Sequence, residues 1–170
     1  NENFFKKWSP EMAYVLGFFT ADGSMLKNKR GAHFIEFQIT DKDLLEEIRE
    51  LLCPNHKITA RKRNNKWKTQ YRLQIGSKII YNDLLKLGLT PNKSKTMKLP
   101  VVPDKYFPHF LRGYFDGDGN VTICVYKRKA RDNKLTTILQ SGFISGSKNF
   151  LANLQNKLSK CLLFPLSYLP

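Results

Sequence analysis

Two short segments of the sequence share one layout, and this repetition constrains the fold more than any other feature. Residues 15–23 read VLGFFTADG, and residues 111–119 read LRGYFDGDG. Each is an apolar, helix-like stretch that ends in Asp-Gly, and Asp118 follows Asp22 by 96 residues. Similar segments at such a spacing indicate repeated structural units. The sequence therefore predicts two related halves.

The elements that follow these segments repeat as well. In the first half we expect a helix over residues 10–22, ended by Gly23 in the left-handed conformation, an alternating strand over 32–40 and a helix over 42–52. The sequence ITDKDLLEEIRELL at 39–52 recurs as SGSKNFLANLQNKL at 145–158. Each half thus begins with an α-β-β-α-type unit, and the two units are expected to be related by a pseudo-twofold axis.

The remainder of the first half has no counterpart in the second. Residues 57–76 form two alternating runs around Asn64-Asn65, a pair typical of a tight hairpin turn, and a helix is expected from 78 to 87 before Gly88. After residue 158 nothing resembles this hairpin. Either the second half is naturally short or a C-terminal piece is missing from the chain, and we favour the latter.

The prolines between the halves indicate a linker, which divides the chain into an N-terminal half at 1–90, a linker at 91–106 and a C-terminal half at 107–170.

The charge of the chain points to a polyanionic partner. Lys and Arg number 29 against 14 Asp and Glu, which gives a net charge of +15. Such a balance favours nucleic acid over a membrane surface. The three cysteines lack the spacing of a zinc site or a disulfide framework, and no apolar run is long enough to span a membrane. We expect a soluble intracellular protein, and the initial Asn suggests a fragment or a processed product.

Small side chains line both repeated helices. Gly17 and Ala21 are four residues apart in the first, and Gly113 and Gly117 are four apart in the second. Residues at this spacing lie on one helix face and let two backbones approach closely. If these faces pack in parallel, Asp22 and Asp118 lie side by side at the two helix C-termini.

Two carboxylates at helix C-termini repel each other and the helix dipoles, so a divalent cation is expected beside them. Asp22 and Asp118, with the backbone carbonyls of Ala21 and Gly117, form an all-oxygen ligand set that suits Mg²⁺, with Mn²⁺ or Ca²⁺ as substitutes for binding. Such ions support phosphodiester hydrolysis. The alternative is that each aspartate is a solvated turn residue, which two matching copies make less attractive.

The two segments resemble the paired signature motifs of the LAGLIDADG homing endonucleases. The resemblance covers most of the chain and departs from the motif at Thr20, in place of an acid, and at Arg112, in place of a small residue. It implies an α+β fold of duplicated αββαββα halves whose antiparallel sheets form a DNA-binding saddle, the second half being incomplete. It also implies a monomer with an internal pseudo-dimer, acting on double-stranded DNA and not on a membrane.

The resemblance further implies metal-dependent cleavage of both strands at a long target site. By motif position Asp22 and Asp118 become the metal-binding catalytic carboxylates, and a lysine near the cleavage centre is expected to assist them. The repeated Lys42 and Lys148 are candidates by symmetry. Spacing does not rank three further candidates, which are Lys93, Lys95 and Lys98.

Polar strand faces are expected to read the DNA, because Arg and Gln make bidentate contacts to base edges. The candidates for this face are Gln38, Arg61, Arg63, Lys68, Gln70, Arg72 and Gln74. Other cations are better placed to contact phosphates. These are Lys27, Lys29, Arg30, Lys127, Arg128, Lys129 and Arg131.

Three functional alternatives follow. The first is an intron-homing DNA endonuclease, located in mitochondria, chloroplasts or a prokaryotic cytoplasm according to the host gene. The second is a non-catalytic nucleic-acid-binding protein on the same fold, either an RNA-splicing maturase or a transcription regulator. The third is an endonuclease embedded in an intein, for which no splice junction is visible. Both carboxylates are retained, which favours the first.

Overall fold

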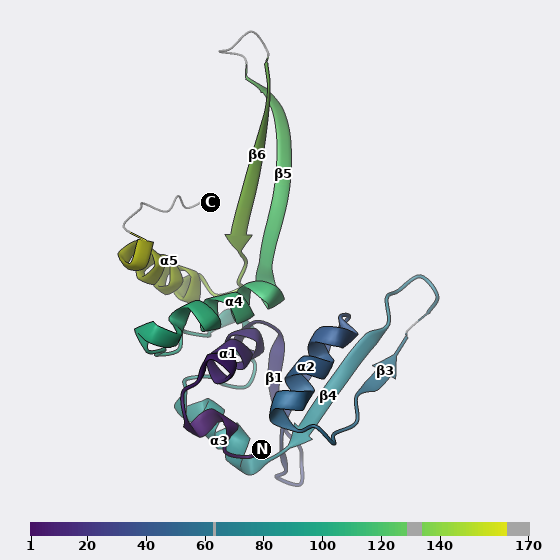
Figure 1. The fold of residues 1–170 in the computed structure, drawn as a ribbon. Helices are drawn as coiled ribbons and strands as arrows, with labels where there is room; N and C mark the ends of the chain where they lie inside the picture. The colour runs from purple at the N-terminus through teal and green to yellow at the C-terminus, as the bar shows by residue number, and fades with distance from the viewer. Residues whose placement is uncertain (63, 129–133, 163–170) are drawn as a thin grey trace.

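The two repeated segments form a pair of helices at the centre of the molecule (Figure 1). The computed structural model describes residues 1–62, 64–128 and 134–162. Helix α1 spans Pro10–Asp22 and α4 spans Phe107–Asp118. The Ser9 side chain accepts a hydrogen bond from the Met12 amide and so caps α1, as the sequence predicts. Each helix runs directly into a strand.

The first half carries a four-stranded antiparallel sheet in the order β1-β2-β4-β3. Its strands are β1 (Gly23–Lys27), β2 (His33–Ile39), β3 (Thr59–Arg61) and β4 (Gln70–Gly76). Helices α2 (Lys42–Leu52) and α3 (Lys78–Lys86) pack on the sheet together with α1. The opposite face carries the polar side chains and is open.

Alternation along the strands separates these two faces. Ile35 lies opposite Ile75 and Phe37 opposite Leu73, and all four are buried beneath the helices. Full burial of such side chains contributes roughly 1.5–3 kcal/mol each. Helix α1 is buried on nearly all sides because it packs between this sheet and α4. This packing on two sides fixes the position of the C-terminal end of α1 relative to the sheet and to α4.

The second half has a different outline. Strands β5 (Gly119–Arg128) and β6 (Lys134–Phe143) form a hairpin that projects from the body, and α5 (Lys148–Leu162) packs beside α4 (Figure 1). Within the described residues β6 pairs only with β5, whereas its counterpart β2 pairs on both sides. One face of the hairpin carries apolar side chains that are 60–69% exposed: Val121, Ile123, Val125, Leu135 and Leu139.

The central helices touch through reciprocal glycine contacts. A methyl group added to Gly17 would collide with the carbonyl oxygen of Phe110, and one added to Gly113 would collide with the carbonyl oxygen of Tyr14. Gly113 follows Gly17 by 96 residues, and Phe110 follows Tyr14 by the same number. The two contacts therefore join equivalent positions of the two halves. This reciprocity is the local signature of the predicted pseudo-twofold axis.

Several expected elements differ in detail. Gly23 was expected to be left-handed, but it is extended (φ −77°, ψ 152°) because it begins β1, a strand that the sequence analysis did not identify. The prediction of a tight hairpin turn at Asn64-Asn65 is wrong, because β3 ends at Arg61 and β4 begins only at Gln70. The predicted end of α3 is confirmed, with Gly88 left-handed at φ 94°. No helix of the described residues is long and apolar enough to cross a membrane.

The segment between the halves is packed rather than extended. It contains the short 3-10 helices η2 (Lys93–Lys95) and η3 (Asp104–Tyr106), besides η1 (Phe4–Lys6) at the start of the chain. Met97 and Val102 are buried, and the Ser147 hydroxyl donates a hydrogen bond of 2.8 Å to the Met97 carbonyl. The segment therefore holds η2 in a defined place against both halves.

The glycine contact generates the first prediction. Alanine is about 1 kcal/mol more favourable than glycine in a free helix, so Gly113→Ala would stabilise an unobstructed one. Here the added methyl must force the helices apart, and we expect the free energy of unfolding in urea to fall by roughly 1–3 kcal/mol. Asn156→Ala, on the exposed side of α5, is the matched control and should change it by less than about 0.5 kcal/mol. Equal stability of Gly113→Ala and wild type would contradict the packing.

Candidate catalytic site

The C-terminal ends of α1 and α4 meet at one point. A methyl group on Gly117 would stand 2.5 Å from the Ala21 side chain and 3.4 Å from a carboxylate oxygen of Asp22. Asp118, the next residue of α4, ends that helix as Asp22 ends α1. The close packing of the helices thus places both aspartates at the same end of the interface.

The charge of Asp118 affects the ionisation of Asp22. Asp22 keeps an exposed surface and Asp118 is half-buried. Partial desolvation, and then the negative charge of Asp118, raise the pKa of Asp22 above its ordinary value, while Lys93 opposes them. Burial likewise raises the pKa of Asp118. No basic residue occupies the last turn of either helix, where a cation would offset the dipole. The pair is therefore an unfavourable concentration of negative charge.

Lys93 is the cation that the structure brings to this pair. It lies in η2 and is only 6% exposed, and its Nζ donates a hydrogen bond of 3.4 Å to the Ala21 carbonyl. Burial lowers the pKa of Lys93 to about 8, against the opposing effects of Asp118 and Asp22. Its ammonium lies 5.9 Å from the centre of the Phe19 ring. Lys93 thus shares one environment with both aspartates.

The other four candidate lysines are exposed and lie in different surroundings. Lys42 forms an ion pair of 2.8 Å with Glu46 on the surface of α2, and Lys148 is exposed at the start of α5. Lys95 and Lys98 are exposed on either side of the buried Met97. Neither aspartate is influenced by any of these four, whereas Lys93 influences both.

The donor set of this site fits a hard divalent cation. Within the described residues no group of three or more His, Cys, Asp or Glu side chains is arranged to hold a metal, so protein carboxylates alone do not enclose an ion. Two carboxylates, the Ala21 carbonyl and ligands from water or a substrate make up the kind of coordination that Mg²⁺ accepts.

The open face of the sheet carries a hydrogen-bonded polar layer. Gln38 donates a bond of 2.7 Å to Gln70, and Glu36 accepts bonds from Arg72 (2.7 Å) and Gln74 (3.0 Å). These two side chains cover Glu36 and leave it 9% exposed. The sequence analysis did not identify this role of Glu36, although it is the one acid among the basic and amide residues of the two central strands.

A hollow of about 330 Å³ joins this polar layer to Asp22. It is lined by Asp22 and Gly117 from the helix ends, by Gln38 and Gln70 from the sheet, and by Asp116. Arg61 lies opposite Gln70 in the strand register, so it extends the same face. The residues predicted to read DNA and those predicted to cut it are therefore adjacent.

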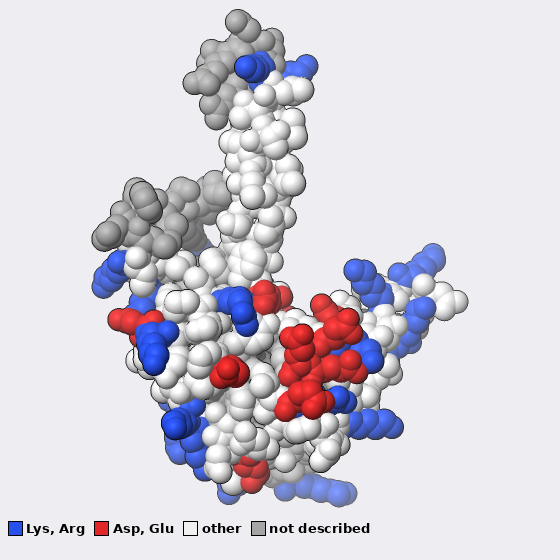
Figure 2. All heavy atoms as spheres, viewed as in Figure 1, with Lys and Arg blue, Asp and Glu red and all other residues white. Residues whose placement is uncertain are grey.

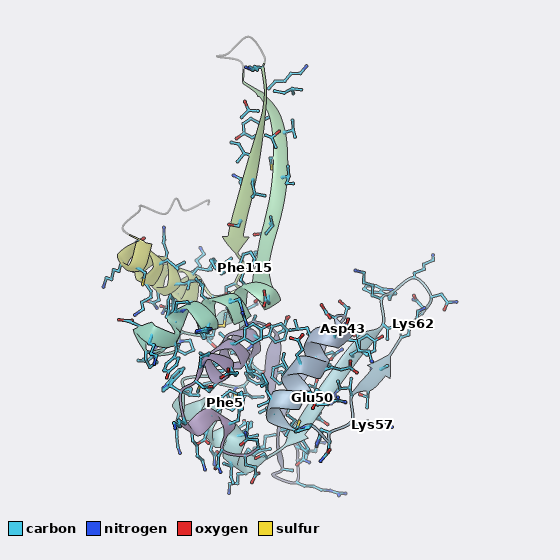
Figure 3. All side chains as sticks on the ribbon, viewed as in Figure 1. Phe5, Asp43, Glu50, Lys57, Lys62 and Phe115 are labelled. Atoms are coloured by element: carbon cyan, nitrogen blue, oxygen red, sulfur yellow. The ribbon has the colours of Figure 1, made fainter. Side chains whose placement is uncertain are left out.

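The face seen in Figure 2 carries one large cluster of acidic side chains, with basic side chains around its edges. Acidic side chains gather over α2, where Figure 3 labels Asp43 and Glu50 on the side away from the polar layer. Predicted phosphate contacts lie at strand ends and turns: Lys27, Lys29 and Arg30 are exposed at the β1–β2 turn, Lys68 before β4 and Lys127 near the end of β5. Arg128 ends β5, and Arg63, Lys129 and Arg131 lie outside the described residues.

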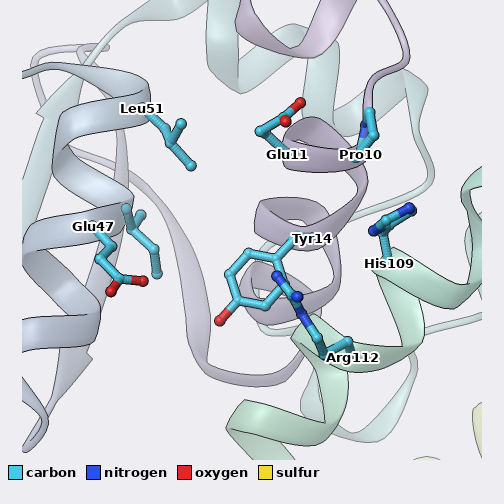
Figure 4. Close-up of a pocket in the computed structure, with 8 residues that line it drawn as sticks. Pro10, Glu11, Tyr14, Glu47, Leu51, His109 and Arg112 are labelled. Atoms are coloured by element: carbon cyan, nitrogen blue, oxygen red, sulfur yellow. The ribbon is translucent and has the colours of Figure 1, made fainter.

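Asp116, the other acid of the second motif, has a separate structural partner. Its carboxylate accepts a hydrogen bond of 2.8 Å from the Tyr14 hydroxyl, and the Arg112 guanidinium lies 4.5 Å from the centre of the Tyr14 ring. Figure 4 shows Tyr14 and Arg112 beside a second hollow, of about 300 Å³, between α1, α2 and α4. Arg112, a departure from the motif, therefore packs on the outside of the helix pair.

Comparison of the chain with known protein families identifies the family to which it belongs. The family model described as "LAGLIDADG-like domain" matches residues 9–95, just over half of the chain. The chain belongs to the LAGLIDADG family. The matched range includes the first signature helix, the complete first sheet and Lys93.

Solved structures of LAGLIDADG proteins share the fold. The meganuclease I-SmaMI, bound to an uncleaved DNA target in the presence of calcium ions, superposes with a TM-score of 0.64 at 17% identity, over 96% of this chain and 76% of that one. I-AabMI bound to uncleaved DNA gives 0.61 at 15% identity, over 92% and 74%. The predicted fold class is thus confirmed.

A curated relative from Methanocaldococcus jannaschii, the uncharacterized protein MJ0398, is 30% identical over 121 residues. This match covers 67% of the chain but 40% of the relative, so the chain spans about two fifths of that protein's length.

The environment of Lys93 generates the second prediction. In an NMR titration of lysine side chains, the Lys93 signal should have its midpoint near pH 8, well below the usual value near 10. A neighbouring carboxylate favours the charged ammonium, so Asp118→Asn should lower that midpoint further, and Asp22→Asn should lower it by less. Asp116→Asn is the matched control and should leave it in place. A wild-type midpoint near 10 would show that Lys93 is hydrated and distant from the pair.

Proposed function

We propose that this LAGLIDADG protein is a site-specific homing endonuclease that cuts both strands of DNA in a Mg²⁺-dependent reaction. The observation that carries the proposal is the meeting of Asp22 and Asp118 beside the buried Lys93, at the edge of an open polar sheet. A site for binding alone would not require two mutually repelling carboxylates at helix C-termini. Features that break local rules in this way are characteristic of functional sites.

The two carboxylates and nearby carbonyl groups would hold the metal. Asp22 and Asp118 provide the charged oxygens, and Ala21 and Gly117 provide backbone oxygens at the helix ends. When bound, Mg²⁺ supplies Lewis-acid chemistry, which favours ionisation of water and stabilises the leaving oxygen in phosphodiester hydrolysis. The calcium complex of I-SmaMI is consistent with divalent ions in this fold.

Lys93 would stabilise negative charge on the phosphate under attack. Its ammonium is already desolvated, so its interaction with a developing charge is stronger than that of a surface lysine. The hydrogen bond to the Ala21 carbonyl and the contact with Phe19 hold it in position. Because its pKa lies near 8, the lysine keeps its charge at neutral pH and loses it in mildly alkaline solution.

The polar layer of the first sheet would bind the major groove. Its glutamines and arginines present several donors and acceptors in a line, and the hydrogen bonds among Glu36, Arg72 and Gln74 hold these groups in fixed positions. The exposed cations at the strand ends would contact phosphates. The chain would act as a monomer, because α1 and α4 already supply both halves of the interface, and DNA as substrate implies an intracellular location.

The competing function is nucleic-acid binding without cleavage, as in an RNA-splicing maturase or a transcription regulator. Retention of both aspartates and of the buried lysine favours the nuclease. Cleavage of sites selected from a randomised duplex library with Mg²⁺ present tests the activity and supplies a target sequence. Binding without cleavage in that experiment would favour the competing function.

The aspartates generate the third prediction. With the selected target, Asp22→Asn and Asp118→Asn should each lower the cleavage rate by at least about 100-fold, because each removes a charged ligand from the reacting centre. Affinity for the duplex without metal should stay within about threefold, since neither residue belongs to the polar layer. Rates are measured in single-turnover gels and affinities by fluorescence anisotropy.

Asp43→Asn is the control for charge, because it removes a carboxylate from the exposed acidic surface of α2. It should cleave at the wild-type rate. Full activity in both Asp22→Asn and Asp118→Asn would overturn the assignment of the site.

A further inference from the structure

The loop between β3 and β4 presents an exposed tryptophan. Trp67 is 61% exposed, although tryptophan is among the most buried residue types on average. Within the described residues its ring makes no stacking or cation–π contact. The other tryptophan, Trp8, stacks on Tyr106 with ring centres 6.1 Å apart. The indole of Trp67 therefore has no evident role in holding the fold together.

The turn that carries Trp67 is defined by hydrogen bonds. The Asn64 carbonyl accepts one of 3.3 Å from the Trp67 amide, and the Asn64 side chain accepts one of 3.0 Å from the Lys66 amide. Asn side chains commonly stabilise turns in this way. The exposed indole thus belongs to a turn with a defined backbone, so little backbone entropy is lost when it contacts a partner.

The charge around Trp67 is uniformly positive. No Asp or Glu occurs between Glu50 and Asp83 in the sequence. Basic side chains flank the indole on both sides, and Figure 2 shows blue side chains over this loop, with Lys62 labelled there in Figure 3. The described basic residues of β3 and of the segments on either side of it that have no acidic ion-pair partner are Lys57, Arg61, Lys62, Lys66 and Lys68.

An aromatic face among cations suits a ligand that has both negative charge and flat apolar surfaces. Nucleic acid has both, and stacking of a base on an aromatic side chain tolerates any sequence. The loop also continues the polar layer, since Arg61 and Gln70 are paired where β3 and β4 leave the sheet. An anionic membrane surface also attracts Trp and Lys, but it does not account for the neighbouring layer of amides.

We propose that Trp67 is a DNA-contacting residue that stacks on a base at the outer end of the segment bound by the first half. The inference rests on the proposed DNA-binding function and adds a stacking contact that the polar layer does not provide. Stacking on a base of a duplex requires that its base step opens, and this unstacking offsets part of the stacking energy. Because Trp67 lies in the loop beyond the ends of β3 and β4, it would act at a flank of the target, away from the aspartates.

The two tryptophans make the contact directly measurable. In Trp8→Phe, Trp67 is the sole indole, and its fluorescence should be quenched by about half or more when the selected duplex saturates the protein. In Trp67→Phe only Trp8 remains, and its fluorescence should be unchanged. Binding is measured independently by anisotropy of a labelled duplex, so absence of any binding would count against the proposed function and not against the role of Trp67.

The energetic test separates stacking from charge. Trp67→Ala should weaken duplex binding by about 10-fold, within the range for loss of one stacked base, while Trp67→Phe stays within about threefold of wild type. Trp67→Ala should leave the salt dependence of affinity unchanged. Lys66→Ala, its neighbour and matched control, should lower the slope of log affinity against log salt by about one. Both side chains are exposed, so thermal unfolding should be unaffected.

Placement is tested with 2-aminopurine substituted at successive flanking positions of the duplex. One position should brighten on binding of the wild type, which reports unstacking, and this signal should be lost with Trp67→Ala. Unchanged fluorescence in Trp8→Phe, together with wild-type affinity of Trp67→Ala, would overturn the proposal. Mixed vesicles of phosphatidylcholine and phosphatidylserine are the second ligand tested. If they quench Trp67 as strongly as the duplex does, the proposal is overturned and the indole is assigned to a membrane surface.

Discussion

The rest of the structure depends on the close contact between α1 and α4. Only glycine at positions 17 and 113 leaves room for the facing carbonyl oxygens of Phe110 and Tyr14. Because the contact is reciprocal, it fixes both the separation of the helices and their relative shift along their axes. The positions of the two helix ends follow from it, and so do the directions in which β1 and β5 leave the interface. The halves are thus joined by backbone contact and not merely by a linker.

This contact forces an electrostatic conflict at one end of the interface. Two carboxylates and two helix C-termini lie together, and the buried ammonium of Lys93 offsets only part of their charge. Lys93 in turn depends on the packing of η2 between the halves, since burial and not the acids dominates its pKa. The pair therefore lowers stability locally, and the remaining core offsets this loss.

The sequence was most informative where the same pattern occurs twice. The duplication identified Asp22, Asp118 and the glycine faces, and periodicity located α1, α2, α3 and β2 closely. Sequence spacing was not enough for Lys93, because proline-rich segments carry no periodicity and burial of a lysine depends on tertiary contacts. Symmetry was also a poor guide to the lysines: the repeated Lys42 and Lys148 are exposed on the surface, while Lys93 lies beside the acids.

Register was equally difficult to predict. The Asn64-Asn65 pair is a strong local signal for a two-residue turn, but cross-strand pairing of Arg61 with Gln70 gives a longer loop. The network of Glu36, Arg72 and Gln74 depends on that pairing, so it was not visible in the alternation of any single strand. Gly23 illustrates the same limit, since its conformation is set by the strand that it begins and not by the helix that it ends.

The two halves also differ in how they protect their sheet edges. The outer strands of the first sheet, β1 and β3, are short and end in Lys27 and Arg61, a combination that discourages pairing with other molecules. Within the described part of the chain the ten-residue β6 pairs only with β5, so its other edge is unpaired beside an apolar face. Long apolar edges of this kind recruit further strands and promote association. Association through this edge would therefore occur at the projecting hairpin and not at the polar layer of the first sheet.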